Sequence, residues 1–353
     1  AALLPNGYGS GGIGPTENFV VAVLDEDTGT PIDGTVEALA GVSCVLPRAA
    51  VSTNDGELLV ACLGTNEVVA MDAAAANPGQ AVTQRFRVPA GPVGIAVDDS
   101  RPRALVWSAH DRALTWILLR GEDGFVLAWE KLPARSPLPA QIDRGRRLFH
   151  ISDARISADG RACASCHPDG RDDGLVWSTP EGPRNPPMLA GRVQGTEPYG
   201  WLGGARDLGA HLDLTLSRLG GRRLSKDDRA ALLAYVAWMK PPPVKIADAT
   251  DPLVREGRRI FESTEAQCGM CHGGAGQSPD GMRHNVLSWA QGDRTGVLDT
   301  PSLRFVAGTA PYFHDGRYTS LRALLTHTRG AMGQEKKLSD HELDALEAYV
   351  STL

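Results

Sequence analysis

Two short cysteine clusters constrain this chain more than any other feature. Four of its six cysteines fall in the motifs Cys163-Ala-Ser-Cys166-His167 and Cys268-Gly-Met-Cys271-His272. C-x-x-C-H is the attachment signature of c-type haem, in which two thiols bond the porphyrin vinyl groups and the adjacent histidine ligates the iron. A single C-x-x-C could instead hold zinc, but zinc needs further Cys or His ligands nearby, and none follows closely. The sequence predicts two covalent haem c groups, with His167 and His272 as proximal ligands.

Each haem motif lies inside a unit that occurs twice. Residues 144–149 (RGRRLF) precede the first motif as residues 256–261 (EGRRIF) precede the second. The units also end alike, with LSKD at 224–227 and LSDH at 338–341, each followed by apolar residues at helical spacing. Pro241-Pro242-Pro243 separates the units. We therefore predict two mainly α cytochrome c-type domains, over residues 140–243 and 250–353.

The two units differ where a sixth iron ligand would come from. An iron with both axial positions filled transfers electrons, whereas an iron with one open position can bind and cleave a peroxide. Aligning the units on Leu208 and Leu321 pairs Met332 with Leu219, and only the thioether can ligate iron. We expect a His272/Met332 iron in the second haem and no equivalent ligand in the first.

Several alternatives to this assignment remain open. Met332 could be a core residue, because methionine packs readily into irregular gaps, and His327 and Met282 are rival ligands. His211 lies four and eight residues before Thr215 and Leu219, so the three share one helix face. On that face His211 could handle protons above the first haem, ligate its iron, or be an ordinary exposed histidine.

The N-terminal residues 1–135 form an all-β segment by their pattern of short apolar runs and turn residues. Pro47 is followed by apolar and turn residues that recur at the same spacing after Pro92. The offset is 45 residues, which suits one β-propeller blade. At most about three such units fit, whereas a closed propeller needs roughly 4–8 blades. We expect an incomplete propeller-like segment, with a small β-sandwich as the alternative, and a proline-rich linker at residues 132–139.

Composition excludes two classes of function. The net charge is −6, which argues against a nucleic-acid partner. No apolar stretch approaches the roughly 20 residues that a membrane helix needs, and the given sequence starts without a basic and apolar leader. Haem c attachment normally takes place outside the cytoplasm, so we expect a periplasmic, extracellular or cell-surface protein. Cys44 and Cys62 could form a disulfide there or remain two buried thiols.

Three further stretches are specific to residues 140–353: GPRNP at 182–186, W…ARDL at 201–208, and TPSLR with TAPYFHDG between 300 and 316. They resemble the bacterial di-haem cytochrome c peroxidase family, which includes related enzymes that mature a tryptophan-derived cofactor on a partner protein. In that family the first haem is peroxidatic and the second transfers electrons. The resemblance also implies one calcium ion, held by the Asn185 side chain and the carbonyls of Thr309 and Pro311, because oxygen ligands suit a hard cation.

The chain departs from the family pattern near the first haem. The catalytic glutamate of the family aligns with Gly209, and a nearby glutamine aligns with Tyr199. We expect His211 to take over the acid/base role, because an imidazole with a pKa near 6.5 can accept and return a proton; Glu197 and Asp213 are weaker candidates. The loop over residues 168–182 contains no histidine that could close the first haem at rest.

Three functions follow from this pattern. The first is a peroxidase that reduces hydrogen peroxide at the first haem, with electrons passed through the second haem from a small cytochrome c or cupredoxin. Trp201 and Trp177 could relay those electrons or could simply be packing aromatics. The second is a di-haem oxidase that modifies a protein or organic substrate. The third is a non-catalytic electron-transfer cytochrome, in which His211 ligates the first iron.

Overall fold

The computed structural model divides the chain into two compact units. It describes residues 20–21, 28, 37–38, 44–75, 81–98, 100–119, 123–133, 136–241, 243, 248, 250–273, 279–328, 331–332 and 338–353. One unit contains residues 17–165 and 224–232, and the other contains residues 1–16, 166–223 and 233–353. Within the predicted linkers, Ala134, Arg135 and Pro242 lie outside the described residues, as do residues 1–19 and most of 22–43 of the predicted β segment.

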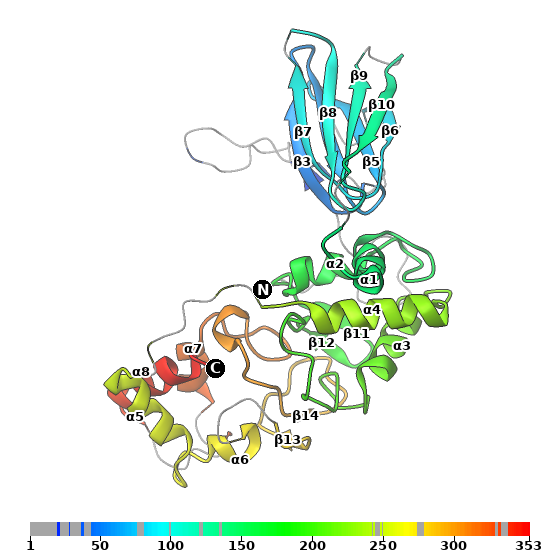
Figure 1. Cartoon of the computed structure of the whole chain (residues 1–353). Helices are drawn as coiled ribbons and strands as arrows, with labels where there is room; N and C mark the ends of the chain where they lie inside the picture. Colours follow the sequence, from blue (N-terminus) through cyan, green and yellow to red (C-terminus); the bar gives the residue numbers. More distant parts are fainter. Residues whose placement is uncertain are drawn as a thin grey trace. The chain divides into compact units, whose positions relative to one another are not determined.

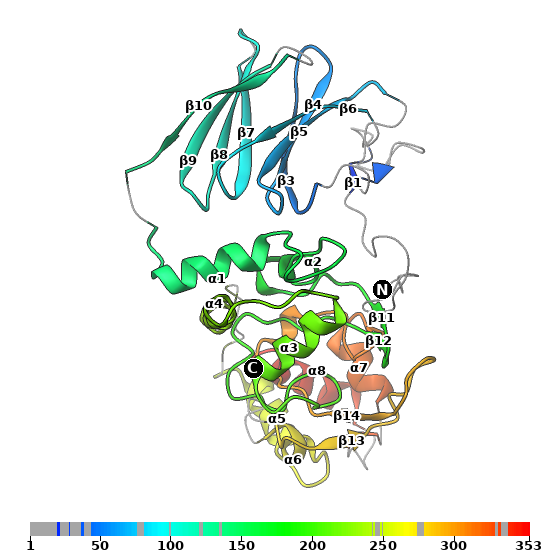
Figure 2. The same ribbon diagram turned by 90° about the vertical axis from the view of Figure 1, so that its right-hand side faces the viewer.

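Two four-stranded antiparallel sheets form the β part of the first unit (Figures 1 and 2). Consecutive strands are neighbours in each sheet, as in a propeller blade. The first sheet contains β3 (Pro47–Ser52), β4 (Glu57–Cys62), β5 (Glu67–Asp72) and β6 (Val82–Arg87). The second contains β7 (Pro92–Asp98), β8 (Arg103–Ser108), β9 (Ala113–Leu118) and β10 (Phe125–Lys131). A further pair, β1 (Val20–Val21) and β2 (Glu37–Ala38), is also antiparallel.

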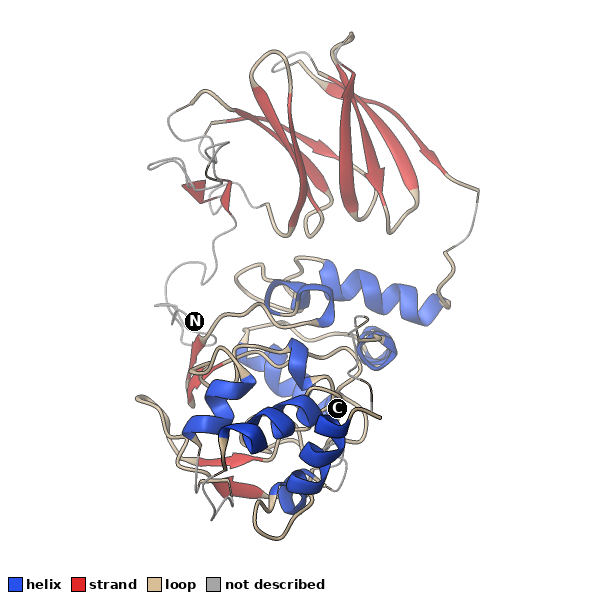
Figure 3. Ribbon diagram, turned by 90° about the vertical axis from the view of Figure 1, so that its left-hand side faces the viewer, coloured by secondary structure: helices blue, strands red, loops and turns tan. Residues whose placement is uncertain are grey.

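The predicted repeat is visible in the backbone of both sheets. Pro47 and Pro92 each begin a sheet. The turn after the second strand of each sheet contains a residue with positive φ, Asn66 in one and Arg112 in the other. The N-terminal all-β fold class, with blade-like repeats followed by a mainly helical region, is confirmed. Figure 3 shows the strands of both four-stranded sheets joined by turns and loops.

One apolar core joins the faces of the two sheets. Leu59, Val68 and Phe86 of the first sheet pack with Val106 and Ile117 of the second. Each of these five residues is at most 4% exposed. On another part of the first sheet, Cys44 and Cys62 form a disulfide with a Cα–Cα distance of 5.1 Å across a separation of 18 residues. The choice that the sequence left open is therefore resolved in favour of the disulfide.

Helix α1 (Ala140–His150) belongs to the same unit as the sheets. Arg147 of α1 donates a hydrogen bond of 2.8 Å to Asp111 in the turn between β8 and β9. His150 and His110 meet edge to face with ring centroids 5.4 Å apart. Because this unit extends to Ser165, the region predicted as the first cytochrome domain contributes residues to both units. The three-domain division remains a prediction.

The second unit is built from short helices, short hairpins and irregular loops. Its regular elements, with the helices that border it, are α2 (Cys163–Cys166), η3 (Pro168–Gly170), β11 (Trp177–Thr179), β12 (Gly182–Arg184), α3 (Leu208–Arg218), α4 (Lys226–Trp238), α5 (Pro252–Phe261), α6 (Cys268–His272), β13 (Arg283–Asn285), β14 (Val297–Asp299), η4 (Val306–Gly308), α7 (Leu321–His327) and α8 (Asp340–Val350). No helix among the described residues is both long and apolar enough to span a membrane.

Helices α5 and α8 pack closely through a glycine. A Cβ atom added to Gly257 of α5 would lie 1.8 Å from the carbonyl oxygen of Ala345, so only glycine allows this approach. One turn along α5, Phe261 meets Tyr349 of α8 edge to face at 5.4 Å. Ser339 caps α8 with Glu342 in the predicted capping box.

The duplicated pattern also folds the same way twice. Tyr199 pairs with Ala205 just before α3, and Tyr312 pairs with Tyr318 just before α7. Asp207 caps α3 and Ser320 caps α7, each accepting a hydrogen bond from the amide three residues on. The two turn-and-helix segments therefore have the same local backbone arrangement in both repeats.

The inter-sheet core generates a stability prediction. Replacing Leu59, which is fully buried, with alanine should lower the free energy of unfolding of the β unit by about 2–5 kcal/mol, because it removes apolar contacts and leaves a cavity. Chemical denaturation followed by circular dichroism measures this. The control is Leu127→Ala in β10, since Leu127 is 46% exposed; equal losses for both variants would contradict the assignment of the core.

Candidate functional site

The first candidate site is a cavity of about 430 Å³ beside α6. Cys268, Cys271 and His272 line it, and neither cysteine forms a disulfide. The His272 Nδ1 atom lies 3.0 Å from the carbonyl oxygen of Pro301, a contact in which it donates and leaves Nε2 free as a metal ligand. Burial lowers the pKa of His272, which favours the neutral imidazole that binds iron. The donor set and the cavity therefore fit a covalent haem c.

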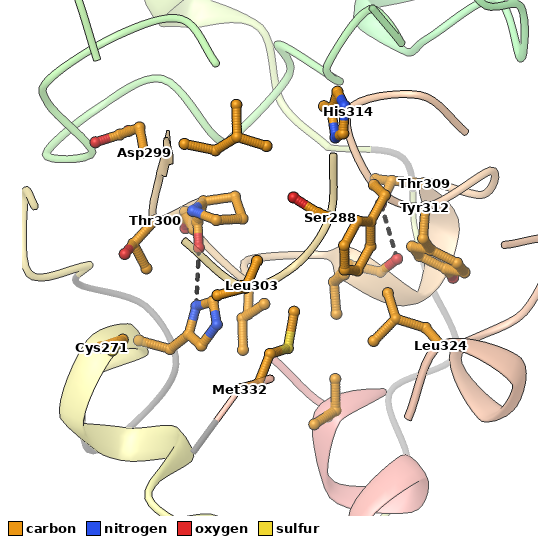
Figure 4. Close-up of a pocket in the computed structure, with 18 of the residues that line it drawn as sticks. Cys271, Ser288, Asp299, Thr300, Leu303, Thr309, Tyr312, His314, Leu324 and Met332 are labelled. Carbon is orange, nitrogen blue, oxygen red and sulfur yellow. Dashed lines mark hydrogen bonds between the residues drawn. The ribbon is translucent and has the colours of Figure 1, made fainter. Parts of the chain in front are cut away.

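Met332 lies in the lining of this His272 cavity, and its side chain points into the space (Figure 4). The two rival ligands do not line the cavity. His327 instead hydrogen-bonds through Nδ1 to the Ala323 carbonyl within α7, at 2.6 Å, and Met282 is 57% exposed. Of the three candidates, only Met332 is brought together with His272.

The second candidate site is a cavity of about 350 Å³ beside the first haem motif. Cys166 and His167 line it, and neither Cys163 nor Cys166 forms a disulfide. Burial lowers the pKa of His167 to about 4, so its imidazole is neutral at pH 7. The second cysteine and the histidine of the motif line this His167 cavity, as they do in the His272 cavity, and this lining fits a second haem c.

Two of the predicted catalytic residues line the His167 cavity. His211 comes from the first turn of α3, and Tyr199, a candidate because it aligns with the family's glutamine, comes from the turn before it. Their ring centroids lie 6.4 Å apart. Glu197, the third predicted residue, is exposed and does not line the cavity, and Asp213 is exposed on α3. The structure thus brings His211 and Tyr199 to His167 and leaves both carboxylates outside.

His211 sits against the backbone of Gly200. A Cβ atom added to that glycine, whose φ is +84°, would lie 3.0 Å from the imidazole Cε1. Burial, followed by the nearby Arg218 charge, lowers the pKa of His211. The imidazole is therefore neutral at pH 7 and able to accept a proton. Tyr199 donates its hydroxyl proton to the Val193 carbonyl at 2.5 Å, and burial raises the pKa of this phenol.

The two cavities differ at two aligned positions of the repeats. Position 211 carries histidine in the His167 cavity, whereas the equivalent position in α7 carries Leu324, which lines the His272 cavity. Conversely, Leu219 does not line the His167 cavity, while Met332 lines the other. The sulfur atoms in the His167 cavity belong to Cys166, which haem attachment would consume, and to Met188, which lines both cavities.

A set of residues borders both cavities, including Asn185, Arg192, Trp201 and Asp299. The Trp201 Nε1 atom donates to the Asn185 carbonyl at 2.9 Å. Burial, and then the charge of Asp280, raises the pKa of Asp299 to about 7. Sequence reasoning missed Arg192 and Asp299, because neither belongs to a motif and their significance comes only from the contact between the two repeats.

Buried polar contacts also join the two repeats. Asp293 accepts hydrogen bonds from Arg184 at 2.7 Å and from the Ala290 amide, and lies 2.9 Å from His314 Nε2. Burial opposes ionisation of Asp293, but these hydrogen bonds outweigh it and hold the pKa of the carboxyl below its usual value. The side chains of Asp293 and His314 are fully buried.

The calcium ligands implied by the sequence resemblance lie at this junction. The Asn185 side chain is 6% exposed and lies 2.5 Å from the Pro311 carbonyl, through Nδ2. Its Oδ1 atom is buried and has no hydrogen-bond partner among the described residues. Thr309, two residues before Pro311, is also buried. An amide oxygen is the kind of ligand that a hard cation such as calcium takes, but the structure turns Nδ2 and not Oδ1 towards the Pro311 carbonyl, and calcium binding stays a prediction.

Comparison with known proteins identifies part of this architecture. Residues 252–350 match the family model described as cytochrome c oxidase, cbb3-type, subunit III. The hydrazine synthase subunit gamma of Kuenenia stuttgartiensis is similar at 25% identity, covering 62% of this chain and 79% of that protein.

Two solved structures are also similar. Hydrazine synthase from Kuenenia stuttgartiensis, pressurised with xenon, aligns with a TM-score of 0.52 and 22% identity, covering 62% of this chain and 89% of that one. A MauG-like protein associated with microbial copper homeostasis aligns with a TM-score of 0.47 and 22% identity, covering 63% and 91%. The family match supports a cytochrome c domain over residues 252–350, and with it covalently bound haem c.

Replacing Met332 tests its position as a ligand. Met332→Leu reproduces the residue found at position 219, so the haem bound by His272 should lose its thioether ligand and shift towards the high-spin ferric state. The absorption band of thioether-ligated ferric haem should disappear from the red region of the spectrum. Met282→Leu is the matched control and should leave the spectrum unchanged; an unchanged spectrum in Met332→Leu would show that another group ligates this iron.

Proposed function

We propose that this protein is a di-haem c-type peroxidase, which reduces hydrogen peroxide at the haem bound by His167 and receives electrons through the haem bound by His272 and Met332. The reciprocal difference between the cavities carries the proposal. The His272 cavity has a thioether and Leu324, which suits electron storage. The His167 cavity has His211 and no thioether from the matching position, which suits binding and protonation of a small oxidant.

Within the His167 cavity, the chain must move protons. When bound, the haem supplies the electron-accepting and electron-donating iron centre for reduction of peroxide. The reaction consumes two protons and two electrons for each peroxide and yields two water molecules. Neutral His211 would accept a proton from the inner oxygen of hydrogen peroxide and return it to the outer oxygen. The protonated outer oxygen is then a better leaving group and departs as water. This replaces the carboxylate that position 209 lacks.

Tyr199 has a positioning role in this proposal. Its hydroxyl donates to the Val193 carbonyl, so the phenol does not compete with His211 for the transferred proton. Its raised pKa keeps the phenol protonated at neutral pH. The ring forms a wall beside His211 and limits the space available to the oxidant.

Electrons are proposed to cross between the cavities near Trp201, because its indole borders both. A small electron-donor protein, such as a cytochrome c or cupredoxin, would refill the haem at His272. Exposed apolar side chains near α6 and the β13–β14 hairpin offer a contact surface for that donor: Met270, Met282, Leu287, Trp289 and Val297. Calcium at Asn185, Thr309 and Pro311 would hold the two repeats in register.

A location outside the cytoplasm belongs to the same proposal. Haem c is normally attached after export, and the Cys44–Cys62 disulfide persists most readily in an oxidising compartment. Hydrogen peroxide and a soluble electron carrier are both available to a periplasmic or cell-surface protein.

An oxidase acting on a protein or organic substrate is the second candidate function. The observation that favours it is Gly209, which gives the first turn of α3 no carboxylate. Such an enzyme would use the same haem pair, with the blade-like sheets available to bind a substrate. Analysis of products separates the two functions, since peroxide reduction needs only an electron donor, whereas the oxidase yields a modified partner.

The peroxidase proposal is tested by His211→Ala. Because the pKa of His211 is lowered, its neutral form persists below pH 6.5, and turnover in the wild type should fall only as the imidazole becomes protonated in more acidic solution. The variant should lose roughly 10²–10⁴-fold in peroxide turnover, and its rate should no longer show this fall in acidic solution. Steady-state kinetics with hydrogen peroxide across pH 4–8 would measure both.

His341→Ala is the control for this experiment, since that histidine is exposed on α8 and pairs with Glu256. It should leave the rate and the pH profile unchanged. Wild-type turnover and pH dependence in His211→Ala would remove His211 from the proton pathway.

A further inference from the structure

One cationic side chain lies between the two cavities without an acidic partner. Arg192, in the loop after β12, borders both the His167 cavity and the His272 cavity. Burial lowers the pKa of its guanidinium to about 10, and the group is still charged at neutral pH. Its Nη2 atom donates a hydrogen bond to the Ser302 carbonyl. Across the described part of the chain, no carboxylate lies within ion-pairing distance of it.

Other largely buried arginines in this protein are paired. Arg184 lies 2.7 Å from Asp293, and Arg161 forms an ion pair with Asp159. A charge removed from water costs free energy unless an opposite charge or several hydrogen bonds compensate it. Asp172 acts on Arg192 only at longer range, and burial raises the pKa of that carboxyl. Arg192 therefore has donors available for a ligand that enters either cavity.

The chemistry of a guanidinium determines which ligand fits. It has five N–H donors in a planar fork that matches carboxylate geometry. Each haem has two propionate carboxylates, which need compensating donors when they are buried. Arg192 borders both cavities, whereas Arg184 is already committed to Asp293.

We propose that Arg192 binds a propionate carboxylate from each of the two haems and acts as a shared cationic clamp between them. This inference rests on the proposed di-haem function, because it needs both cavities to be occupied. A positive charge near an iron stabilises its reduced form, which has the lower charge. Arg192 therefore raises the reduction potential of both haems and links their electrostatic environments through one side chain.

The test uses the holoprotein in which Arg192 is replaced by glutamine or by lysine. Haem content is measured first as the pyridine haemochrome, and the two midpoint potentials are then measured by spectroelectrochemical titration. Arg192→Gln should lower both potentials, because both propionates lose their cation. Arg192→Lys keeps the charge but loses the fork, so both potentials should fall by a smaller amount.

Arg171→Gln is the matched control. Arg171 also donates to a backbone carbonyl, that of Gly308, at 2.8 Å, but it is exposed and lines neither cavity. Its replacement should leave both potentials unchanged. Unchanged potentials in Arg192→Gln, or a change in only one of them, would overturn the shared clamp.

The lysine variant decides the question if the glutamine variant fails to load both haems. Wild-type potentials in a fully loaded Arg192→Lys protein would overturn the inference, and a fall in both would support it. The proposed function fails separately: a wild-type protein with one haem, or with two haems and no peroxide turnover, contradicts the peroxidase proposal. Lowered potentials for two haems would still support the clamp in a protein that does not turn over peroxide.

Discussion

The mainly helical second unit depends on a bound group that fills two apolar cavities, which its own side chains leave open. Its helices are short, and much of the chain between them is irregular. Cys166 and His167 line one of these cavities, and Cys268, Cys271 and His272 line the other. A chain with so little regular structure needs a large apolar group in its centre, because burial of apolar surface is the dominant favourable term in folding. Covalent attachment keeps that group in place.

Polar contacts then fix how the two repeats meet. Asp293 contacts Arg184 of the first repeat through Oδ1 and His314 of the second through Oδ2, so both of its carboxylate oxygens have partners. Asn185 extends the same junction to Pro311. Breaking one partner of a buried pair leaves an uncompensated charge, which is strongly destabilising. These contacts therefore specify the alignment of the cavities that border Trp201 and Arg192.

Duplication allows one scaffold to support two kinds of iron site. The paired turns at Tyr199 and Tyr312 position α3 and α7 alike, so single substitutions within those segments change the chemistry without changing the fold. In the proposed function, His211 would supply a proton carrier in one cavity, where the other has Leu324. Met332 would supply a thioether in that other cavity, where the aligned position of the first repeat has Leu219.

The sequence predicted the parts of this arrangement that depend on local pattern. The 45-residue offset located both sheets, and alignment of the repeats placed His211 and Met332 at cavities that the structure contains. It gave Glu197 a catalytic role that its exposed side chain does not favour, because a short spacing in sequence does not determine which way a turn residue points. Arg192 and Asp299 could not be found from sequence, since their burial arises where distant segments meet.

Electron paramagnetic resonance of the resting, fully oxidised holoprotein tests the central asymmetry most directly. A ferric iron with an open position at His167 gives a high-spin signal, and one ligated by His272 and Met332 gives a low-spin signal. We expect one high-spin and one low-spin signal in equal amounts. Two low-spin signals would show that protein atoms ligate both irons, and the chain would then be an electron carrier with no open catalytic iron.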